Sequence, residues 1–134
     1  MIGTCLCRRV KVEVVGQPGH INICNCAYCR KAGHAAGLFP ESAVEVCGET
    51  RSYVRDDMAD PWMTLHFCPT CGSATHSTGT PEHPCDVVRV NVRLFDLGAV
   101  ADVEARFLDG DAVKSEDDPF PLIATAKYGH GTTF

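Results

Sequence analysis

Cys24-Asn25-Cys26-Ala27-Tyr28-Cys29 is the most informative stretch of the sequence, because three cysteines fall within six residues. Cysteines this close together rarely reach the Cα separation and Cβ direction that a disulfide between them needs. A C-x-C-x-x-C run can instead turn its three sulfurs toward one point, and Zn²⁺ binds three or four thiolates in a tetrahedron at about 2.3 Å. Three local ligands leave the fourth position free. The stretch therefore predicts a metal site that can accept an outside ligand.

Four more cysteines form two further pairs, Cys5/Cys7 and Cys68/Cys71. Each group lies where a predicted strand meets a turn, so its sulfurs can be directed at one point. This clustering favours metal binding over the alternative, in which buried free thiols act as small hydrophobic residues. Spacing leaves two pairings open. One joins the last two cysteines of the central stretch to Cys68/Cys71 as a zinc ribbon. The other joins the two outer pairs in a closed four-thiolate site and leaves the central three as an open site.

Nine cysteines in 134 residues would suggest a disulfide framework in a secreted protein, but the count is odd. The N-terminus, Met1-Ile2-Gly3-Thr4-Cys5, also lacks the charged, apolar and cleavage regions of a secretory signal. We therefore expect a cytoplasmic protein with reduced thiols. Cys47 and Cys85 fall outside the clusters; we interpret Cys47 as a strand residue and Cys85 as incidental.

Composition predicts a globular chain, with 45% hydrophobic and 22% charged residues. The length predicts one domain over residues 1–134. No apolar run approaches the roughly 18 residues of a membrane-spanning helix, so we expect no membrane partner. The net charge is −5, and zinc bound by thiolates would leave it negative. Such a charge disfavours a nucleic-acid partner.

Period-two alternation of apolar residues predicts a mainly β protein with many short strands. The expected strands cover residues 10–14, 20–24, 35–39, 63–67, 74–77, 86–92 and 103–108. Residues 44–47 and 52–54 are expected to form a hairpin across Gly48-Glu49. A short helical turn is expected at residues 30–32, ended by Gly33, and the tail from Phe120 shows no clear period.

The order of the cysteine motifs resembles the glutathione-dependent formaldehyde-activating enzyme (GFA) family, which is also represented by centromere protein V. The motifs are C-x-C near the N-terminus, C-x-C-x-x-C after the second strand, and F-C-x-x-C-G some forty residues later, in which Phe67 and Gly72 also match. The resemblance is strongest over residues 3–108. It implies a single GFA-like zinc-binding domain with a mainly β, Mss4-like fold of small antiparallel sheets stapled by zinc.

The resemblance also implies two zinc ions and an activity. The implied ligands are Cys5, Cys7, Cys68 and Cys71 for a structural zinc, and Cys24, Cys26 and Cys29 for an open, catalytic zinc. The implied activity is that of a carbon–sulfur lyase, which joins formaldehyde and glutathione to S-hydroxymethylglutathione. The expected partners are a small thiol such as glutathione and a small aldehyde. Many family members have Cys-His-Cys at the start of the central motif, where this chain has Asn25.

Other residues near the motifs are candidates for substrate contacts. Arg30 and Lys31 directly follow the central stretch and are predicted to meet the carboxylates of a glutathione-like ligand; the alternative is that both are solvated. His34 is the first candidate for the general acid that protonates the aldehyde oxygen, and His66 is the second. Trp62 either closes a pocket or simply packs.

Two alternative hypotheses accompany the lyase. The first is a non-catalytic binding module in which zinc only stabilises the fold, since the sequence offers no firm acid–base pair. The second replaces zinc with iron at a thiolate site, which would colour the pure protein.

Overall fold

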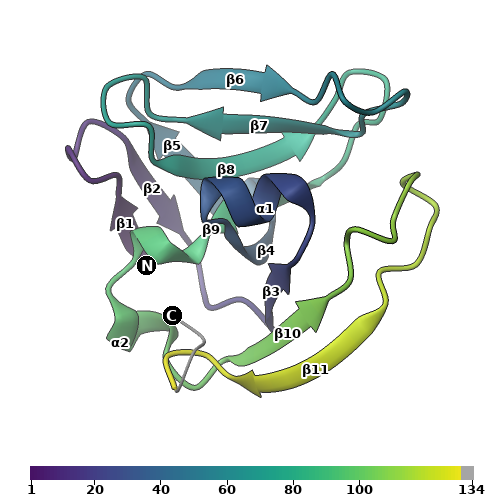
Figure 1. The fold of residues 1–134 in the computed structure, drawn as a ribbon. Helices are drawn as coiled ribbons and strands as arrows, with labels where there is room; N and C mark the ends of the chain where they lie inside the picture. The colour runs from purple at the N-terminus through teal and green to yellow at the C-terminus, as the bar shows by residue number, and fades with distance from the viewer. Residues whose placement is uncertain (131–134) are drawn as a thin grey trace.

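The computed structural model describes residues 1–130, and short strands dominate it (Figure 1). The strands are β1 (Ile2–Thr4), β2 (Lys11–Val14), β3 (Ile21–Cys24), β4 (Ala35–Pro40), β5 (Val44–Cys47), β6 (Arg51–Val54), β7 (Met63–Phe67), β8 (Ala74–Gly79), β9 (Val87–Asn91), β10 (Glu104–Leu108) and β11 (Leu122–Lys127). The helices are α1 (Ala27–Ala32) and α2 (Leu97–Val100), with 3-10 turns η1 (Glu41–Ala43) and η2 (Val92–Leu94). The predicted mainly β class is confirmed. Within the described part of the chain, no helix has the length and apolar character needed to span a membrane.

The strands form two sheets of unequal size. The smaller has the order β1-β2-β5, and the larger has the order β11-β10-β3-β4-β9-β8-β7-β6. Neighbouring strands run antiparallel except β3 and β10, which are parallel. In Figure 1, β6, β7 and β8 lie at the top of the molecule, β10 and β11 lie at the bottom, and α1 lies between them.

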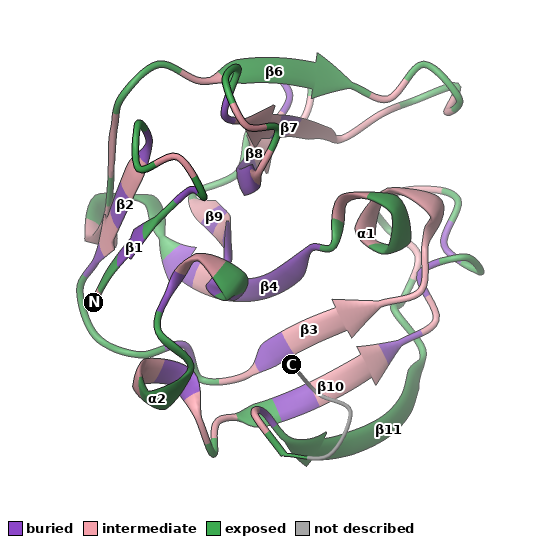
Figure 2. Cartoon of the chain, turned by 60° about the vertical axis from the view of Figure 1, so that its left-hand side comes forward, coloured by how far each residue is buried: buried purple, intermediate pink, exposed green. Residues whose placement is uncertain are grey.

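The core lies where the two sheets meet, because their alternating apolar residues face one another there. β2 buries Val12 and Val14, and β9 buries Val88 and Val90 in the same cluster. Ile21 of β3 completes this group without solvent exposure. Figure 2 shows that β4 and parts of β3 and β10 are buried, whereas β6 and β11 are exposed. The observed alternation is the one that the sequence predicts for a half-buried sheet.

One expectation about local structure is wrong, and one strand has no signal in the sequence. The expected hairpin of residues 44–47 with 52–54 does not form, because β5 pairs with β2 and β6 pairs with β7. Gly48 lies at φ 102° so close to Arg9 that an added Cβ would be 2.1 Å from the Arg9 oxygen. The chain therefore leaves the small sheet here instead of folding back. β11 was not expected in the tail. All six of its residues are exposed, so no buried face imposes an alternation of apolar and polar residues on its sequence.

Asn91 connects three segments of the core through its side chain. Its Nδ2 donates to the Ala74 oxygen at 3.0 Å, and its Oδ1 accepts from the Ala35 nitrogen at 3.2 Å. Asn91 is 4% exposed. Its amide thus satisfies two backbone groups that neighbouring strands leave unpaired in the core.

We expect Asn91→Leu to lower the free energy of unfolding by about 2–6 kcal/mol, because each buried group left unpaired costs about 1–3 kcal/mol. Chemical denaturation measures the loss. Gln17→Leu is the control, since Gln17 is exposed and its side chain donates only to the Ala99 oxygen at 3.1 Å. Equal stability of the two variants would contradict the assigned role of Asn91.

Candidate metal centre and its cavity

The thiols of Cys5, Cys7, Cys68 and Cys71 gather where the turn after β1 meets the turn after β7. All four sulfurs lie within 4.8 Å of one another. Cys7 Sγ is 3.5 Å from Cys5 Sγ and 3.6 Å from Cys68 Sγ. Tetrahedral zinc, with Zn–S bonds of about 2.3 Å, spaces its sulfurs about 3.8 Å apart. The cluster therefore has the size and donor set of a closed four-thiolate zinc site, with Cys5 and Cys68 buried.

Two tight turns direct these four sulfurs. In the first, Arg8 adopts a left-handed φ of 63° and its N–H donates to the Cys5 oxygen at 2.9 Å. In the second, Gly72 has φ 73° and its N–H donates to the Cys68 oxygen at 2.9 Å. A left-handed residue is therefore part of both turns, and glycine adopts this conformation without strain.

The remaining clustered thiols, those of Cys24, Cys26 and Cys29, form a second group whose sulfurs also lie within 4.8 Å of one another. Cys24 ends β3, Cys26 directly precedes α1, and Cys29 belongs to that helix. Gly33 ends α1 in a left-handed conformation, and its N–H donates to the Cys29 oxygen. The break in secondary structure between β3 and α1 is what brings the three sulfurs to one point.

The three thiols strongly influence one another's ionisation. Hydrogen bonds from Cys24 and Cys29 lower the pKa of Cys26, whereas hydrogen bonds with Cys24 and Cys26 raise the pKa of Cys29. One thiolate is thus favoured, and further negative charge is resisted. A bound dication removes this resistance, because metal coordination deprotonates thiols. The donor set fits zinc, with one position left for an outside ligand.

The three-thiol group opens into a cavity of about 260 Å³. Most of its wall is apolar; side chains that contribute are Leu38, Met58, Trp62, Leu65, Val113 and Phe120. Arg55 and Arg89 also line it. The four-thiol group does not line this cavity, so the two groups differ in the way that separates closed structural zinc from open catalytic zinc.

Three buried polar atoms along this cavity have no hydrogen-bond partner in the protein: Asn22 Oδ1, Tyr28 OH and His34 Nε2. His34 is 4% exposed, and burial lowers its pKa to about 4, so the ring is neutral at pH 7. Burial also raises the pKa of Tyr28, and the negative charges of Cys29 and Cys26 raise it further. Buried polar atoms usually have partners, so these three indicate a polar ligand.

The other candidates from the sequence lie outside the cavity wall. Arg30 and Lys31 are exposed, and Arg30 Nε donates to the Asn25 oxygen at 2.6 Å. His66 stacks on His76 with ring centroids 4.2 Å apart. The carboxylate-binding role of Arg30 and Lys31 stays a prediction, as does the acid role of His34.

The segment after β10 is held against the three-thiol group by Asn25. The Asn25 Nδ2 donates to Asp109 Oδ1 at 2.9 Å, and its Oδ1 accepts from the Asp111 nitrogen at 3.0 Å. Gly110 between them leaves no room for a side chain, since an added Cβ would lie 2.1 Å from Cys24 Sγ. Asn25, which lies between Cys24 and Cys26 in the sequence, therefore anchors residues 109–111.

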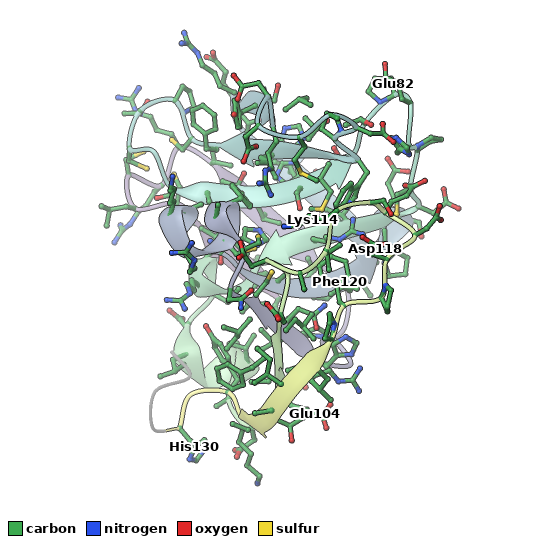
Figure 3. The ribbon with its side chains drawn as sticks, turned by 45° about the vertical axis from the view of Figure 1, so that its right-hand side comes forward. Glu82, Glu104, Lys114, Asp118, Phe120 and His130 are labelled. Atoms are coloured by element: carbon green, nitrogen blue, oxygen red, sulfur yellow. The ribbon has the colours of Figure 1, made fainter. Side chains whose placement is uncertain are left out.

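A second anchor holds the same segment farther along. His83 Nδ1 lies 2.9 Å from Glu116 Oε1, and His83 Nε2 lies 2.8 Å from Asp60 Oδ1. The hydrogen bond to Asp60 raises the pKa of His83 most, and the hydrogen bond to Glu116 raises it further. Figure 3 shows Lys114, Asp118 and Phe120 together on this segment. His83 therefore connects the segment after β10 to the segment before β7.

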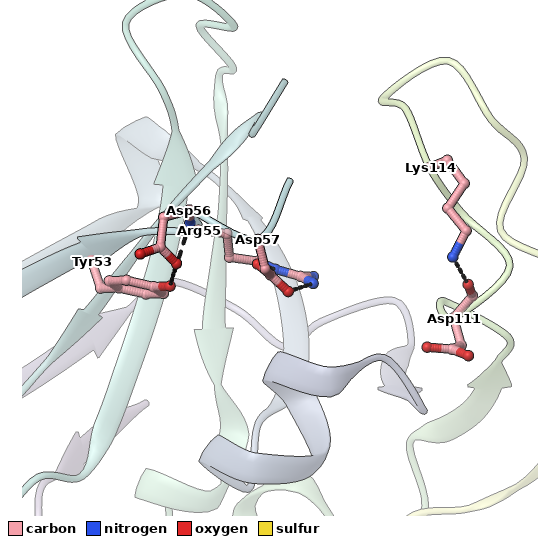
Figure 4. A network of polar contacts seen from close by, with 6 residues as sticks. All are labelled: Tyr53, Arg55, Asp56, Asp57, Asp111 and Lys114. Atoms are coloured by element: carbon pink, nitrogen blue, oxygen red, sulfur yellow. Dashed lines mark hydrogen bonds and ion pairs between the residues drawn. The ribbon is translucent and has the colours of Figure 1, made fainter. Parts of the chain in front are cut away.

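Neither of the two cavity arginines has a local signal in the sequence. Arg89 alternates with the buried Val88 and Val90, a pattern that predicts a solvent-facing residue. Arg55 lies in a polar loop beside Asp57, with which it forms an ion pair of 2.7 Å (Figure 4).

Figure 4 also shows a hydrogen bond within the segment after β10, from Lys114 Nζ to the Asp111 backbone oxygen.

Comparison with known proteins identifies relatives of the chain. The family model described as glutathione-dependent formaldehyde-activating enzyme matches residues 1–107. A crystal structure of a Rhodobacter sphaeroides protein is 30% identical, with a TM-score of 0.59 over 72% of this chain and 88% of that chain. No curated protein sequence was found to match. The segment that carries Gly110, Val113 and Phe120 lies outside the family match.

We expect Cys68→Ser and Cys26→Ser to differ in stability. Cys68→Ser should remove the ion that joins the two turns and most of the folding stability, because structural zinc contributes on the order of 10 kcal/mol. Cys26→Ser should lose one ion and stay folded. Metal analysis and thermal unfolding measure both, with the exposed Cys85→Ser as control. Complete unfolding of both cluster variants would support the binding-module alternative.

We expect Gly110→Ala to reduce the metal content from two ions per chain to one, because the new Cβ displaces the segment from Cys24. Gly98→Ala is the matched control, since nothing lies within 4 Å of its added Cβ. Metal analysis of both variants provides the test. Retention of two ions in Gly110→Ala would show that the segment does not support the three-thiol group.

Proposed function

The chain belongs to the glutathione-dependent formaldehyde-activating enzyme family, and from this premise we propose that it is a zinc-dependent carbon–sulfur lyase. Its substrates are a small thiol, such as glutathione, and formaldehyde or another small aldehyde. The observation that carries the proposal is the contrast between the two thiol groups, of which only the three-thiol group lines a cavity. We also propose a cytoplasmic location, since metal-binding thiols must stay reduced.

The proposed reaction adds the substrate thiol to the aldehyde. The S–H bond breaks, a C–S bond forms, and the C=O double bond becomes a C–OH single bond that takes the proton. Zinc at Cys24, Cys26 and Cys29 would lower the pKa of a coordinated thiol. The other tasks, which are to orient the aldehyde and to carry the proton, belong to the cavity wall.

His34 is the proposed proton carrier. Its ring is neutral at pH 7, and its Nε2 faces no protein partner. That nitrogen can accept the thiol proton and return it to the aldehyde oxygen as the C–S bond forms. Tyr28 OH is a second group that can hydrogen-bond the developing hydroxyl.

Arg55 and Arg89 are the cationic side chains in the cavity wall and add to the candidates for carboxylate binding. Arg30 and Lys31 remain proposed for the same role from outside the wall. Comparing Arg89→Gln with Arg30→Gln would separate the arginines of the wall from the residues outside it. Substitution of the residue that contacts the carboxylate should raise KM, because the charge that binds the substrate is lost.

We expect the zinc-loaded chain to accelerate formation of S-hydroxymethylglutathione from formaldehyde and glutathione, as measured by NMR exchange rates. Cys26→Ser should lose this acceleration, and Cys85→Ser should keep it. A preparation that holds two zinc ions and gives no rate above the spontaneous reaction would refute the formaldehyde activity.

A further inference from the structure

The wall of the cavity is larger and more apolar than one-carbon chemistry requires. Met58 and Trp62 contribute from the segment before β7, and Val113 and Phe120 from the segment after β10. Phe120 is 43% exposed in the structure. Formaldehyde is too small to cover this surface, so the apolar wall indicates a ligand with a hydrophobic body.

The charges of the cavity are those of a site for a single anionic group. Arg89 lines the cavity, and within residues 1–130 its guanidinium forms no ion pair with a carboxylate. Arg55 is already paired in bidentate fashion with Asp57, at 2.8 and 2.7 Å. This leaves Arg89 as the unpaired cation of the described wall.

The described part of the cavity wall offers no carboxylate to an ammonium group. Among the described residues, no Asp or Glu lines the cavity. Glutathione carries two carboxylates and one ammonium, so burying it here would leave charges unpaired at high cost. Two of the three neutral polar atoms that lack partners along this cavity, His34 Nε2 and Tyr28 OH, suit a hydroxyl or carbonyl oxygen beside the three-thiol group.

Arg89 is held by its strand on the same side as the apolar wall. It is paired in register with Leu38 of β4, which also lines the cavity. His34 directly precedes β4 and lies within range of the Arg89 charge, which contributes to the lowered pKa of the ring. The anion site and the unpartnered polar atoms therefore belong to one continuous surface.

We propose that this cavity selects a thiol with an apolar, aromatic-sized body and a single carboxylate, in preference to glutathione, with Arg89 binding the carboxylate and Trp62 and Phe120 enclosing the body. The inference rests on the proposed function, since the thiol sulfur is placed at the three-thiol group. It refines that function by naming the side chains that select the thiol, of which Phe120 lies outside the family match.

The test is calorimetric titration of the zinc-loaded full chain with four thiols and no aldehyde. 2-Mercapto-3-phenylpropanoate has both the body and the carboxylate, 2-phenylethanethiol lacks the carboxylate, mercaptoacetate lacks the body, and glutathione is the family's thiol. We expect the first to bind at least tenfold more tightly than each of the others. Equal or tighter binding of glutathione would overturn the proposal without any need for a variant.

Two variants then assign the contacts. Arg89→Leu should weaken 2-mercapto-3-phenylpropanoate about tenfold and leave 2-phenylethanethiol unchanged, and Arg51→Leu on exposed β6 is its control. Phe120→Ala should weaken both phenyl thiols and leave mercaptoacetate unchanged, with Ile123→Ala on exposed β11 as control. An equal effect of each variant on all thiols would refute the assignment.

The readout separates this inference from the lyase activity. Selective binding without catalysis of any aldehyde addition would refute the lyase and leave the selectivity in place. Catalysis with formaldehyde and glutathione, together with glutathione binding as tight as that of the phenyl thiol, would refute the selectivity and support the lyase.

Discussion

The contact between the turn after β1 and the turn after β7 is the constraint on which the remaining structure depends. These turns belong to different sheets, and Cys5 and Cys68 meet between them with 1% and 0% exposure. Outside the metal cluster, this contact is small: Val10 is the one further buried residue of its cluster among those described. A four-thiolate ion would supply the attraction that so few apolar side chains cannot. Trp62 directly precedes β7, so the position of β7 also determines where Trp62 contributes to the cavity wall.

The three-thiol group is built on a different principle, because one of its walls comes from a distant part of the chain. Cys24, at the end of β3, contacts Gly110 after β10, and these two strands are the parallel pair of the larger sheet. Parallel neighbours bring their carboxyl ends to the same edge. The sulfur group and the segment after β10 are therefore neighbours for a topological reason. Asn25 adds two hydrogen bonds that hold this segment in place.

The sequence was sufficient for features whose signal is local. Alternation predicted most strands, and cysteine spacing identified both groups of thiols, although it left their pairing open. It failed where long-range pairing decides. β5 and β6 looked like a hairpin, but each found a partner elsewhere. Arg89 resembled a solvated strand residue, and Phe120 lay in a tail without period, because the cavity they share is formed only by the fold.

The unpartnered polar atoms of the cavity lower the stability of the fold, but they also leave groups available to bind a ligand. Asn22, Tyr28 and His34 each bury a polar atom without a protein partner, and each such atom costs about 1–3 kcal/mol. Apolar side chains of similar size would remove that cost. The same burial that disfavours a charged His34 keeps its ring neutral and its Nε2 free to exchange hydrogen bonds with a ligand. A ligand oxygen that pairs with these atoms would therefore recover the cost of leaving them unpaired, directly beside the three-thiol group.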